Sequence, residues 1–313
     1  MDLDIFGRDL FGDPIRPRVS GPVAERFTFP PFTVLDARAG EWQDRKRAWA
    51  SMGMRGEVGR DAAAIHCPTT SRESSLDDAN YTSIFDPVVC ELAYRWFSSA
   101  GAQIIDPFAG GSVRGIVAGA LGRSYWGCDL RAEQIEANEQ QAEDIAPLVR
   151  PTWICGDSRD TLVYAPEADL LFTCPPYGDL EQYSDDLLDL SAMSWTGFTI
   201  AYRLILQRAV ARLKNNRFAV LVVGNFRDTK TGVYRDLVGE TVAAMSSEGL
   251  GYYNEAVLVT SVGSASMRVS KQFDAGRKFC KTHQNVLVFC KGDWRKASAY
   301  CVGAGLASSE QVA

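Results

Sequence analysis

The residues of this chain that are best suited to chemistry lie in four short segments, each directly after an apolar run typical of a buried strand. These segments are residues 106–112 (D-P-F-A-G-G-S), 127–130 (G-C-D-L), 155–158 (C-G-D-S) and 173–177 (T-C-P-P-Y). Together they contain carboxylates, glycines, a thiol, a Pro-Pro pair and an aromatic ring. Ligands of open parallel sheets bind at the carboxyl ends of the strands. We therefore expect the four segments to surround one ligand site.

The first three segments favour a ligand that contains a nucleoside. Gly110 and Gly111 between a strand and a helix would let a ligand approach the backbone closely, although an isolated Gly-Gly is more often only a tight turn. Asp129 follows the next strand, where a carboxylate can accept both hydroxyls of a ribose, while a lone Asp there is more often a helix cap. Asp157 is suited to accept from the amino group of an adenine, a weak signal by itself. No Lys-Ser or Lys-Thr follows the glycines, which excludes a P-loop.

The fourth segment, Cys174-Pro175-Pro176-Tyr177, favours a planar base with an exocyclic amino group. Two prolines fix an extended, rigid turn after a buried strand. Backbone carbonyls in such a turn can accept from the amine while the base stacks on Tyr177. A Pro-Pro turn is otherwise a common loop device, but its place after the other three segments favours the functional interpretation.

The surrounding sequence alternates predicted strands with predicted helices from about residue 85 onward. The strands are predicted at 103–105, 124–128, 152–155, 169–173, 218–223, 256–262 and 285–289. The helices are predicted at 87–97, 112–121, 132–145 and 195–213, with Asp86 as the N-cap of the first. This alternation indicates an α/β fold with a doubly wound, mostly parallel, Rossmann-like sheet.

Composition excludes several classes of protein. The chain has 313 residues and a net charge of −6, so it is not a protein that coats nucleic acid over its whole surface. No apolar run approaches the ~20 residues that span a bilayer, and the acidic N-terminus does not look like a secretory signal. The eight cysteines lack the spacing of a zinc site, and there are only two histidines. We therefore expect no metal, no membrane contact, and reduced thiols in a cytoplasm.

The four segments, in this order, resemble the amino-group DNA methyltransferases that use S-adenosylmethionine, and most of all the methylase-like proteins carried by bacteriophages. The family signature is D-P-F-x-G-x-G followed by D/N/S-P-P-Y/F, and the resemblance covers about residues 81–292. It includes Phe85-Asp86-Pro87, similar to the segment that packs near the methionine end of the cofactor, and the H-x-x-V/I-L-x-F strand at residues 283–289. The resemblance implies a class I methyltransferase fold over residues 81–297, an N-terminal extension over 1–80 and a C-terminal tail over 298–313.

The resemblance also assigns roles to individual residues. The catalytic residues that it implies are Cys174, Pro175, Pro176 and Tyr177. The residues that it implies for S-adenosylmethionine are Phe85, Asp86, Asp106, Pro107, Phe108, Ala109, Gly110, Gly111, Ser112, Asp129, Leu130, Asp157 and Ser158. In this interpretation the Pro175 carbonyl is the first acceptor for the amino group of a flipped base, and Cys174 or a water is the second.

Cys174 departs from the family pattern, which has Asp, Asn or Ser at this position, and a thiol is a weak hydrogen-bond acceptor. Ser is typical of the cytosine-N4 enzymes and Asp or Asn of the adenine-N6 enzymes. The size of cysteine slightly favours cytosine N4. Cys174 is disfavoured as a cytosine-C5 nucleophile, because it precedes the prolines and no Glu-Asn-Val element occurs. Replacement of the usual Gly-Ser-Gly by Gly110-Gly111-Ser112 is a minor departure.

Charge is unevenly distributed, and this suggests where DNA would bind. Residues 157–190 contain nine acidic residues against one arginine, whereas residues 261–296 contain eight basic residues against two acidic ones. We predict that 261–283 is a loop that contacts phosphates, with a solvated surface loop as an equal alternative. Its candidate DNA-binding residues are Arg268, Lys271, Arg277, Lys278 and Lys281.

A second basic stretch, Arg45-Lys46-Arg47, lies between Trp42 and Trp49. Tryptophans seven residues apart share one helix face, so a packed helix with a charged outer face is favoured over a DNA reader. We expect no extra recognition domain of ~100 residues between or after the motifs. We therefore expect a double-stranded DNA substrate with a short or loosely specified target, a homodimer, or a separate partner that reads sequence, as in restriction-modification systems.

Three other functions stay open at this point. A nicotinamide-dependent oxidoreductase would explain the glycine turn and Asp129 but not Cys-Pro-Pro-Tyr. A methyltransferase acting on RNA or a small molecule would share the same segments, because RNA enzymes also use Pro-Pro-Tyr. A protein that binds cofactor or DNA without turnover is the third, since Cys174 replaces the usual acceptor.

Overall fold

The computed structural model describes residues 22–54, 85–178, 186–228, 230–263 and 265–302. Expectations for residues 1–21, 55–80 and 303–313 lie outside the described residues. Within the described ranges, no helix combines the length and apolar character that a bilayer span requires.

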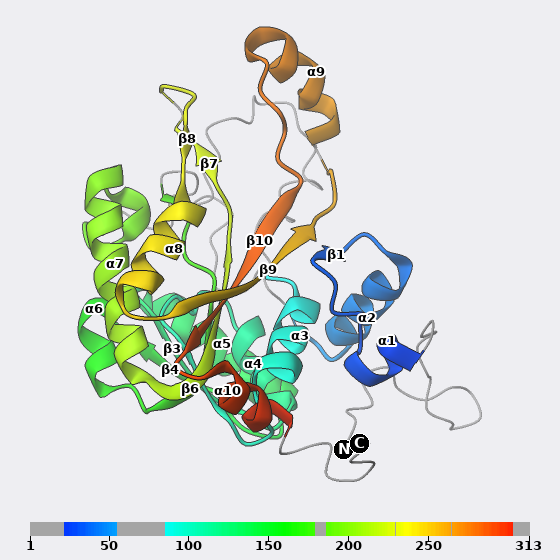
Figure 1. Ribbon diagram of the computed structural model, residues 1–313, viewed down its shortest axis with the longest axis vertical. Coiled ribbons are helices and arrows are strands. Elements are labelled where there is room, and N and C mark those ends of the chain that lie inside the picture. Colours follow the sequence, from blue (N-terminus) through cyan, green and yellow to red (C-terminus); the bar gives the residue numbers. More distant parts are fainter. Residues whose placement is uncertain (1–21, 55–84, 179–185, 229, 264, 303–313) are drawn as a thin grey trace.

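One eight-stranded sheet forms the centre of the molecule (Figure 1). Its spatial order is β1 (Val34–Asp36), β9 (Gly251–Val259), β10 (His283–Lys291), β6 (Leu213–Val223), β5 (Ala168–Thr173), β2 (Gln103–Asp106), β3 (Ser124–Asp129) and β4 (Thr152–Cys155). All neighbouring pairs in this sheet are parallel except the two that involve β10. This topology confirms the predicted doubly wound, mostly parallel fold.

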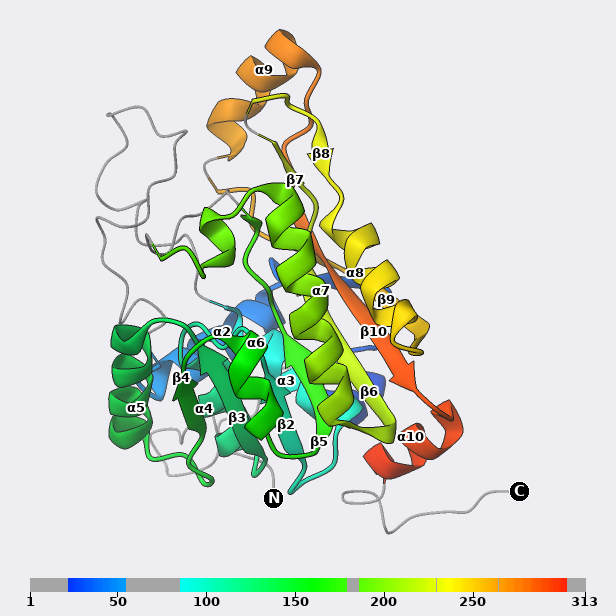
Figure 2. The ribbon, with the colours of Figure 1, turned by 90° about the vertical axis from the view of Figure 1, so that its left-hand side faces the viewer.

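Helices cover both faces of the sheet, and each face has its own hydrophobic core. Alternate residues of the central strands point to opposite faces, so Ile104 and Phe172 belong to one core, whereas Ile105 and Leu171 belong to the other. The first face carries α2 (Gly40–Ser51), α3 (Pro87–Phe97), α4 (Val113–Ala120), α5 (Ala132–Ile145) and α10 (Trp294–Val302). The second carries α7 (Trp195–Arg212), α8 (Leu237–Ser247) and the short helices α6 (Ser158–Thr161), η2 (Leu162–Tyr164) and η4 (Leu190–Ala192), as Figure 2 shows for α6, α7 and α8.

Local sequence signals explain why several elements have the predicted bounds. Asp86 accepts a hydrogen bond from Val88 N at 2.9 Å and Pro87 occupies the first helical position, so α3 begins where capping chemistry places it. The helices at 87–97 and 132–145 and the strand at 152–155 match residue for residue. β5 is buried along its whole length, as expected of a central parallel strand.

Other elements differ from the prediction. β6 begins at Leu213 rather than 218, and β9 spans Gly251–Val259 rather than 256–262. Helix α8 was not predicted, and α10 occupies part of the segment expected to be a tail from residue 298. Residues 261–283, predicted as a loop, contain helix α9 (Ala265–Gly276), because their glycines stand at its ends rather than in its interior.

The described part of the N-terminal extension is integrated into the domain. After α1 (Pro22–Phe27), β1 adds to the sheet as a parallel partner of β9, and α2 packs on α3. Trp42 and Trp49 are almost completely buried, which confirms the packed helix predicted there. Trp49 Nε1 donates to Glu91 Oε2 at 2.8 Å, and Arg45 forms an ion pair with the same carboxylate.

One part of the molecule projects away from the sheet. The hairpin of β7 (Phe226–Arg227) and β8 (Tyr234–Arg235) and helix α9 extend together beyond the carboxyl ends of the strands (Figures 1 and 2). Helix α10 lies at the opposite end of the molecule in both views.

Candidate functional site

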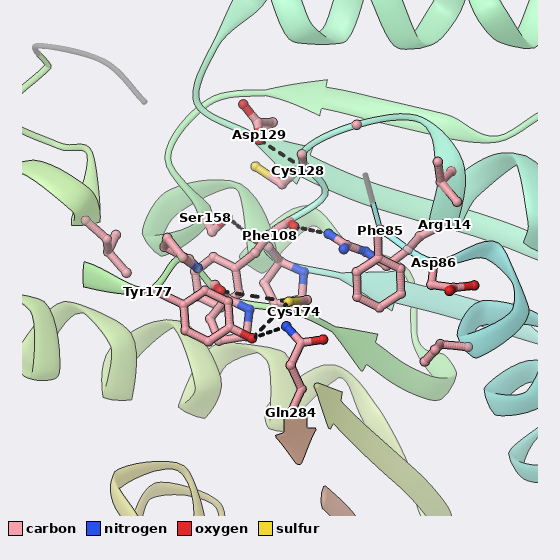
Figure 3. Close-up of a pocket in the computed structure, with 18 of the residues that line it drawn as sticks. Phe85, Asp86, Phe108, Arg114, Cys128, Asp129, Ser158, Cys174, Tyr177 and Gln284 are labelled. Carbon is pink, nitrogen blue, oxygen red and sulfur yellow. Dashed lines mark hydrogen bonds between the residues drawn. The ribbon is translucent and has the colours of Figure 1, made fainter. Parts of the chain in front are cut away.

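A cavity of about 460 Å³ lies at the carboxyl ends of the central strands. It sits where the chain order reverses between β2 and β5, the place at which doubly wound sheets bind ligands. All four predicted segments contribute to its wall (Figure 3). The predicted site residues that line it are Phe85, Asp86, Pro107, Phe108, Gly110, Gly111, Asp129, Leu130, Asp157, Ser158, Cys174, Pro175, Pro176 and Tyr177.

Asp106, Ala109 and Ser112 were predicted to bind the cofactor, but they do not line this cavity, and the prediction is corrected for them. All three are buried beneath the glycine segment. Ala109 N donates to Cys128 O at 2.9 Å, which ties the segment to β3. Ser112 precedes the first turn of α4, and its side chain is enclosed. Their role is therefore to shape the loop.

Asp106 is the centre of a buried hydrogen-bond network that fixes the floor of the site. Its carboxylate accepts from Thr173 Oγ1 at 2.5 Å, Arg114 Nε at 2.5 Å, Tyr125 OH at 2.7 Å and Phe108 N at 3.1 Å. A carboxylate offers about four acceptor positions, so none is left for a ligand. Burial alone would lower the pKa of Arg114, but the Asp106 carboxylate keeps it above its ordinary value.

Arg114 also lines the cavity, although no pattern in the sequence indicated this. Its guanidinium donates to the carbonyls of Phe108 and Ala109, and lies 4.7 Å from the centre of the Phe85 ring. The side chain is almost completely buried. Arg114 therefore connects the glycine segment to Phe85, the residue expected near the methionine end of the cofactor.

Asp129 holds the glycine segment and still faces the cavity. One carboxylate oxygen accepts from Gly110 N at 3.0 Å and the other from Arg131 N at 3.0 Å, which leaves about two acceptor positions for a ligand. Burial raises the pKa of Asp129. Gly110 has a φ of 49°, in the left-handed region that favours glycine, and its carbonyl accepts from Asn138 Nδ2 at 2.7 Å.

Residues 155–158 are hydrogen-bonded to the glycine segment, but the Asp157 carboxylate is already bound by Arg159. Ser158 Oγ donates to Pro107 O at 2.5 Å. Asp157 caps α6 by accepting from Arg159 N at 2.8 Å, and it forms an ion pair of 2.5 Å with the Arg159 guanidinium. Asp157 is therefore a helix cap, the role that had been the alternative for Asp129, and it also lines the cavity wall.

The Cys-Pro-Pro-Tyr segment enters the cavity from the end of β5. Tyr177 is half-buried rather than enclosed in the core, and its ring meets the edge of Phe226 at a centroid distance of 6.5 Å. Its hydroxyl accepts from Gln284 Nε2 at 2.7 Å, and Cys174 Sγ lies 4.0 Å from the same hydroxyl. The glycine segment and the Pro-Pro segment therefore face one space, as expected.

Two elements distant in sequence complete the wall. Gln43 and Lys46 of α2 line the cavity beside Asp86, with Lys46 Nζ 3.5 Å from Asp86 Oδ2. Gln284 of β10 lines the wall next to Tyr177. Gln284 belongs to residues 283–289, a strand that is part of the family resemblance. Membership of this strand was the one sequence feature that could have indicated its place at the site. No pattern in the sequence indicated that α2 would reach the site.

The predicted DNA-binding residues fall into two groups. Arg268, Lys271 and Arg277 are exposed on α9 or directly after it. Lys278 and Lys281 are half-buried, and Lys281 Nζ donates to Asn225 O at 3.1 Å. Burial lowers the pKa of Lys281. Lys281 and the cavity residue Tyr177 are both neighbours of Gly224, so Lys281 lies beside the cavity. Arg268 and Lys271 lie on the projecting helix α9.

Among the metal-ligating and thiol side chains of the described ranges, no three or more His, Cys, Asp or Glu gather as a metal site would require. The seven cysteines in these ranges are free thiols. Burial raises the pKa of Cys128, which lines the cavity, to about 11, so this thiol is protonated at neutral pH.

Comparison with known proteins gives similarity of fold only. No protein-family model and no curated protein matches the chain. Among solved structures, TrmN from Thermus thermophilus is 17% identical with a TM-score of 0.46, over 69% of this chain and 52% of its own. Magnesium protoporphyrin IX methyltransferase from Synechocystis with bound SAM is 12% identical with a TM-score of 0.40, over 62% and 71%. Precorrin-6y C5,15-methyltransferase from Geobacter metallireducens is 12% identical with a TM-score of 0.43, over 74% and 100%. The chain thus spans about half the length of TrmN, and these likenesses extend no further than the arrangement of sheet and helices.

Proposed function

We propose that the protein transfers a methyl group from S-adenosylmethionine to the exocyclic amino group of a base flipped out of double-stranded DNA, with cytosine N4 favoured over adenine N6. The observation that carries the proposal is the shared cavity of the glycine segment and Cys174-Pro175-Pro176-Tyr177. One part offers acceptors for a nucleoside, and the other offers a rigid turn and an aromatic face.

The residues of the cavity fit S-adenosylmethionine. Asp129 retains acceptor positions for ribose hydroxyls, and the backbone at Gly110 and Gly111 is open to close approach. Phe85, Asp86 and Lys46 form another part of the wall, where a ring and opposite charges suit an amino acid group. When bound, S-adenosylmethionine supplies a sulfonium methyl group that a nitrogen nucleophile can take.

In this proposal the protein accelerates the reaction mainly by positioning the two reactants and by forming a hydrogen bond to the amino group of the base. The Pro175 carbonyl, in this proposal, accepts a hydrogen bond from the amino group, which localises the nitrogen lone pair that otherwise delocalises into the ring. The Tyr177 ring provides a stacking surface. The Asp106 network keeps the two loops in register, so that the reacting groups meet in a fixed geometry, which is the largest source of acceleration expected here.

DNA would approach along the projecting α9 and the β7–β8 hairpin. Arg268, Lys271 and Arg277 are exposed there, and such cations contact phosphates without reading sequence. Lys281, beside the cavity, is suited to the phosphate next to a flipped nucleotide.

The direct test is transfer of a labelled methyl group to DNA and to RNA, followed by mass spectrometry of the nucleosides. Label in N4-methylcytosine or N6-methyladenine of DNA supports the proposal, and label only in RNA would change the substrate class. Tyr177→Ala and Asp129→Ala should each lose activity on the order of a hundredfold. Tyr164→Ala is the matched control, because Tyr164 is 86% exposed and lies outside the cavity wall.

A further inference from the structure

Gln284 places an amide group against the catalytic tyrosine. It lies on β10, which runs antiparallel to β6, and its side chain lines the cavity on the side of Tyr177 (Figure 3). Its Nε2 donates to Tyr177 OH at 2.7 Å. The two residues come from separate parts of the chain, so their contact forms only in the folded protein.

The oxygen of the Gln284 amide is available to accept a hydrogen bond. The side chain of Gln284 forms no second hydrogen bond with the described part of the chain, and its Oε1 belongs to a residue of the cavity wall. With its nitrogen directed at the Tyr177 hydroxyl, its oxygen is the atom left to accept. An amide oxygen is a stronger acceptor than a thiol.

A second acceptor is needed because the thiol of Cys174 is a weak hydrogen-bond acceptor. The amine of a base has two protons, and one acceptor on each is the arrangement that localises the lone pair. Pro175 supplies one carbonyl. Cys174 supplies only a sulfur, which lies 4.0 Å from both Pro175 O and Tyr177 OH. We propose that Gln284 Oε1 accepts the second hydrogen bond from the amino group of the target base, in place of the acceptor that Cys174 lacks.

This assignment rests on the proposed function and defines a catalytic residue for it. Gln284 remains neutral and unchanged throughout. The amine nitrogen forms a bond to the methyl carbon, the carbon–sulfur bond breaks with its electron pair on sulfur, and the nitrogen releases one proton to water. The amide strengthens the nucleophile before this step and does not take the proton.

The first experiment compares two substitutions at this position. Gln284→Met keeps the length of the side chain and removes the acceptor, and we expect kcat to fall on the order of a hundredfold. Gln284→Glu keeps an acceptor, and kcat should stay within about tenfold of wild type. The Kd for S-adenosylmethionine, measured by calorimetry, should be unchanged in both. Gln140→Leu on the exposed side of α5 is the control and should retain wild-type activity.

The second experiment separates acceptance from positioning of Tyr177. Cys174→Asn introduces an acceptor at the family position, and in the Gln284→Met background it should restore at least about tenfold of the lost kcat. Tyr177→Phe removes the hydroxyl that Gln284 binds but keeps the ring, and it should cost far less than Gln284→Met. Equal losses in Tyr177→Phe and Gln284→Met, or failure of Cys174→Asn to restore activity, would overturn the assignment. Full activity of Gln284→Met would overturn it while leaving the proposed function intact, whereas an inactive wild-type protein would overturn both.

Discussion

Thr173 Oγ1 donates a hydrogen bond of 2.5 Å to Asp106 Oδ1, and this contact joins the two strands that carry the two halves of the site. Asp106 is the last residue of β2 before the glycine segment, and Thr173 is the last residue of β5 before Cys174. Both side chains are fully buried. The Asp106 carboxylate therefore adds to the pairing of β2 with β5 in fixing the glycine segment relative to the Cys-Pro-Pro-Tyr segment, and it has no further acceptor position for a ligand.

Thr173→Val tests this link, because valine has the shape of threonine without the hydroxyl. Loss of the donor leaves one acceptor position of the buried Asp106 carboxylate unsatisfied, at a cost of about 1–3 kcal/mol in the free energy of unfolding. Urea denaturation measures this change, and kcat should fall with it. Thr199→Val is the control, because the Thr199 hydroxyl donates to Thr196 O near the surface of α7 and makes no other hydrogen bond within the described ranges. Equal stability of the two variants would contradict the role of the link.

Asp129 gives the site a dependence on pH. Burial raises the pKa of Asp129, so its carboxylate becomes protonated at a higher pH than the ~3.9 of an exposed aspartate. Binding of ribose hydroxyls favours the ionised form. The affinity for S-adenosylmethionine should therefore weaken as the pH falls through this raised pKa.

The measurement is calorimetric titration of S-adenosylmethionine at several values of pH, for wild type and Asp129→Asn. The Asn variant should bind on the order of tenfold more weakly at neutral pH, and its affinity should not share the acidic decline. Asp144→Asn, at an exposed position on α5, should behave as wild type. A wild-type affinity that is constant down to about pH 4 would exclude this role of Asp129.

The sequence allowed the centre of the fold and the core of the site to be predicted, because their signals are local. The signal of Pro87 after Asp86 and that of the apolar run Leu170–Phe172 shortly before Cys174 depend only on neighbouring residues. Strand order at the switch point then follows from general rules of doubly wound sheets. This is why 14 residues of the predicted site line one cavity.

Contacts between residues far apart in the sequence could not be predicted from such local signals. An aspartate after a strand has the same sequence signal whether it faces a ligand or is enclosed, and Asp106 became enclosed because Arg114, Tyr125 and Thr173 all reach it. Lys46 reaches the cavity from α2, which packs on α3, and Gln284 reaches it from β10, where it pairs with Leu258 of β9. Both placements depend on contacts between segments far apart in the sequence. The helix α9 was missed because its serines and glycines are equally typical of a loop.

Glu91 holds the N-terminal extension to the domain, and its replacement should detach α2. The carboxylate is fully buried and binds Arg45, Arg95 and Trp49 Nε1. Removing one partner of a buried ion pair costs about 3–5 kcal/mol. Because both arginines are partly exposed, we expect Glu91→Gln to lower the free energy of unfolding by about 3 kcal/mol.

The difference between wild type and Glu91→Gln should also depend on pH. Burial alone would raise the pKa of Glu91, but the Arg45 and Arg95 guanidinium groups hold it below its ordinary value. A carboxyl with a lowered pKa in the folded state stabilises the protein above its unfolded-state pKa, about 4.3, and this contribution is lost as the pH falls through the folded-state value. Urea unfolding at several pH values should therefore show the two proteins converging in acid. A constant difference from pH 7 to pH 3 would contradict the assigned ion pairs. Glu136→Gln, on the exposed side of α5, is the control.

Basic residues of the projecting α9 should determine how DNA binding responds to salt. Each phosphate contact contributes about 0.9 to the slope of log K against log salt for duplex DNA. Replacing Arg268 and Lys271 with glutamine should therefore weaken binding to any sequence and reduce this slope by up to about 1.8, measured by fluorescence anisotropy over a range of KCl concentrations. The matched control replaces Arg295 and Lys296 on α10, which carries the same charge at the opposite end of the molecule (Figure 1). Because net charge changes equally in both pairs, a general electrostatic effect would alter both slopes alike. Only a contact made at α9 would alter the first slope and leave the second as in wild type.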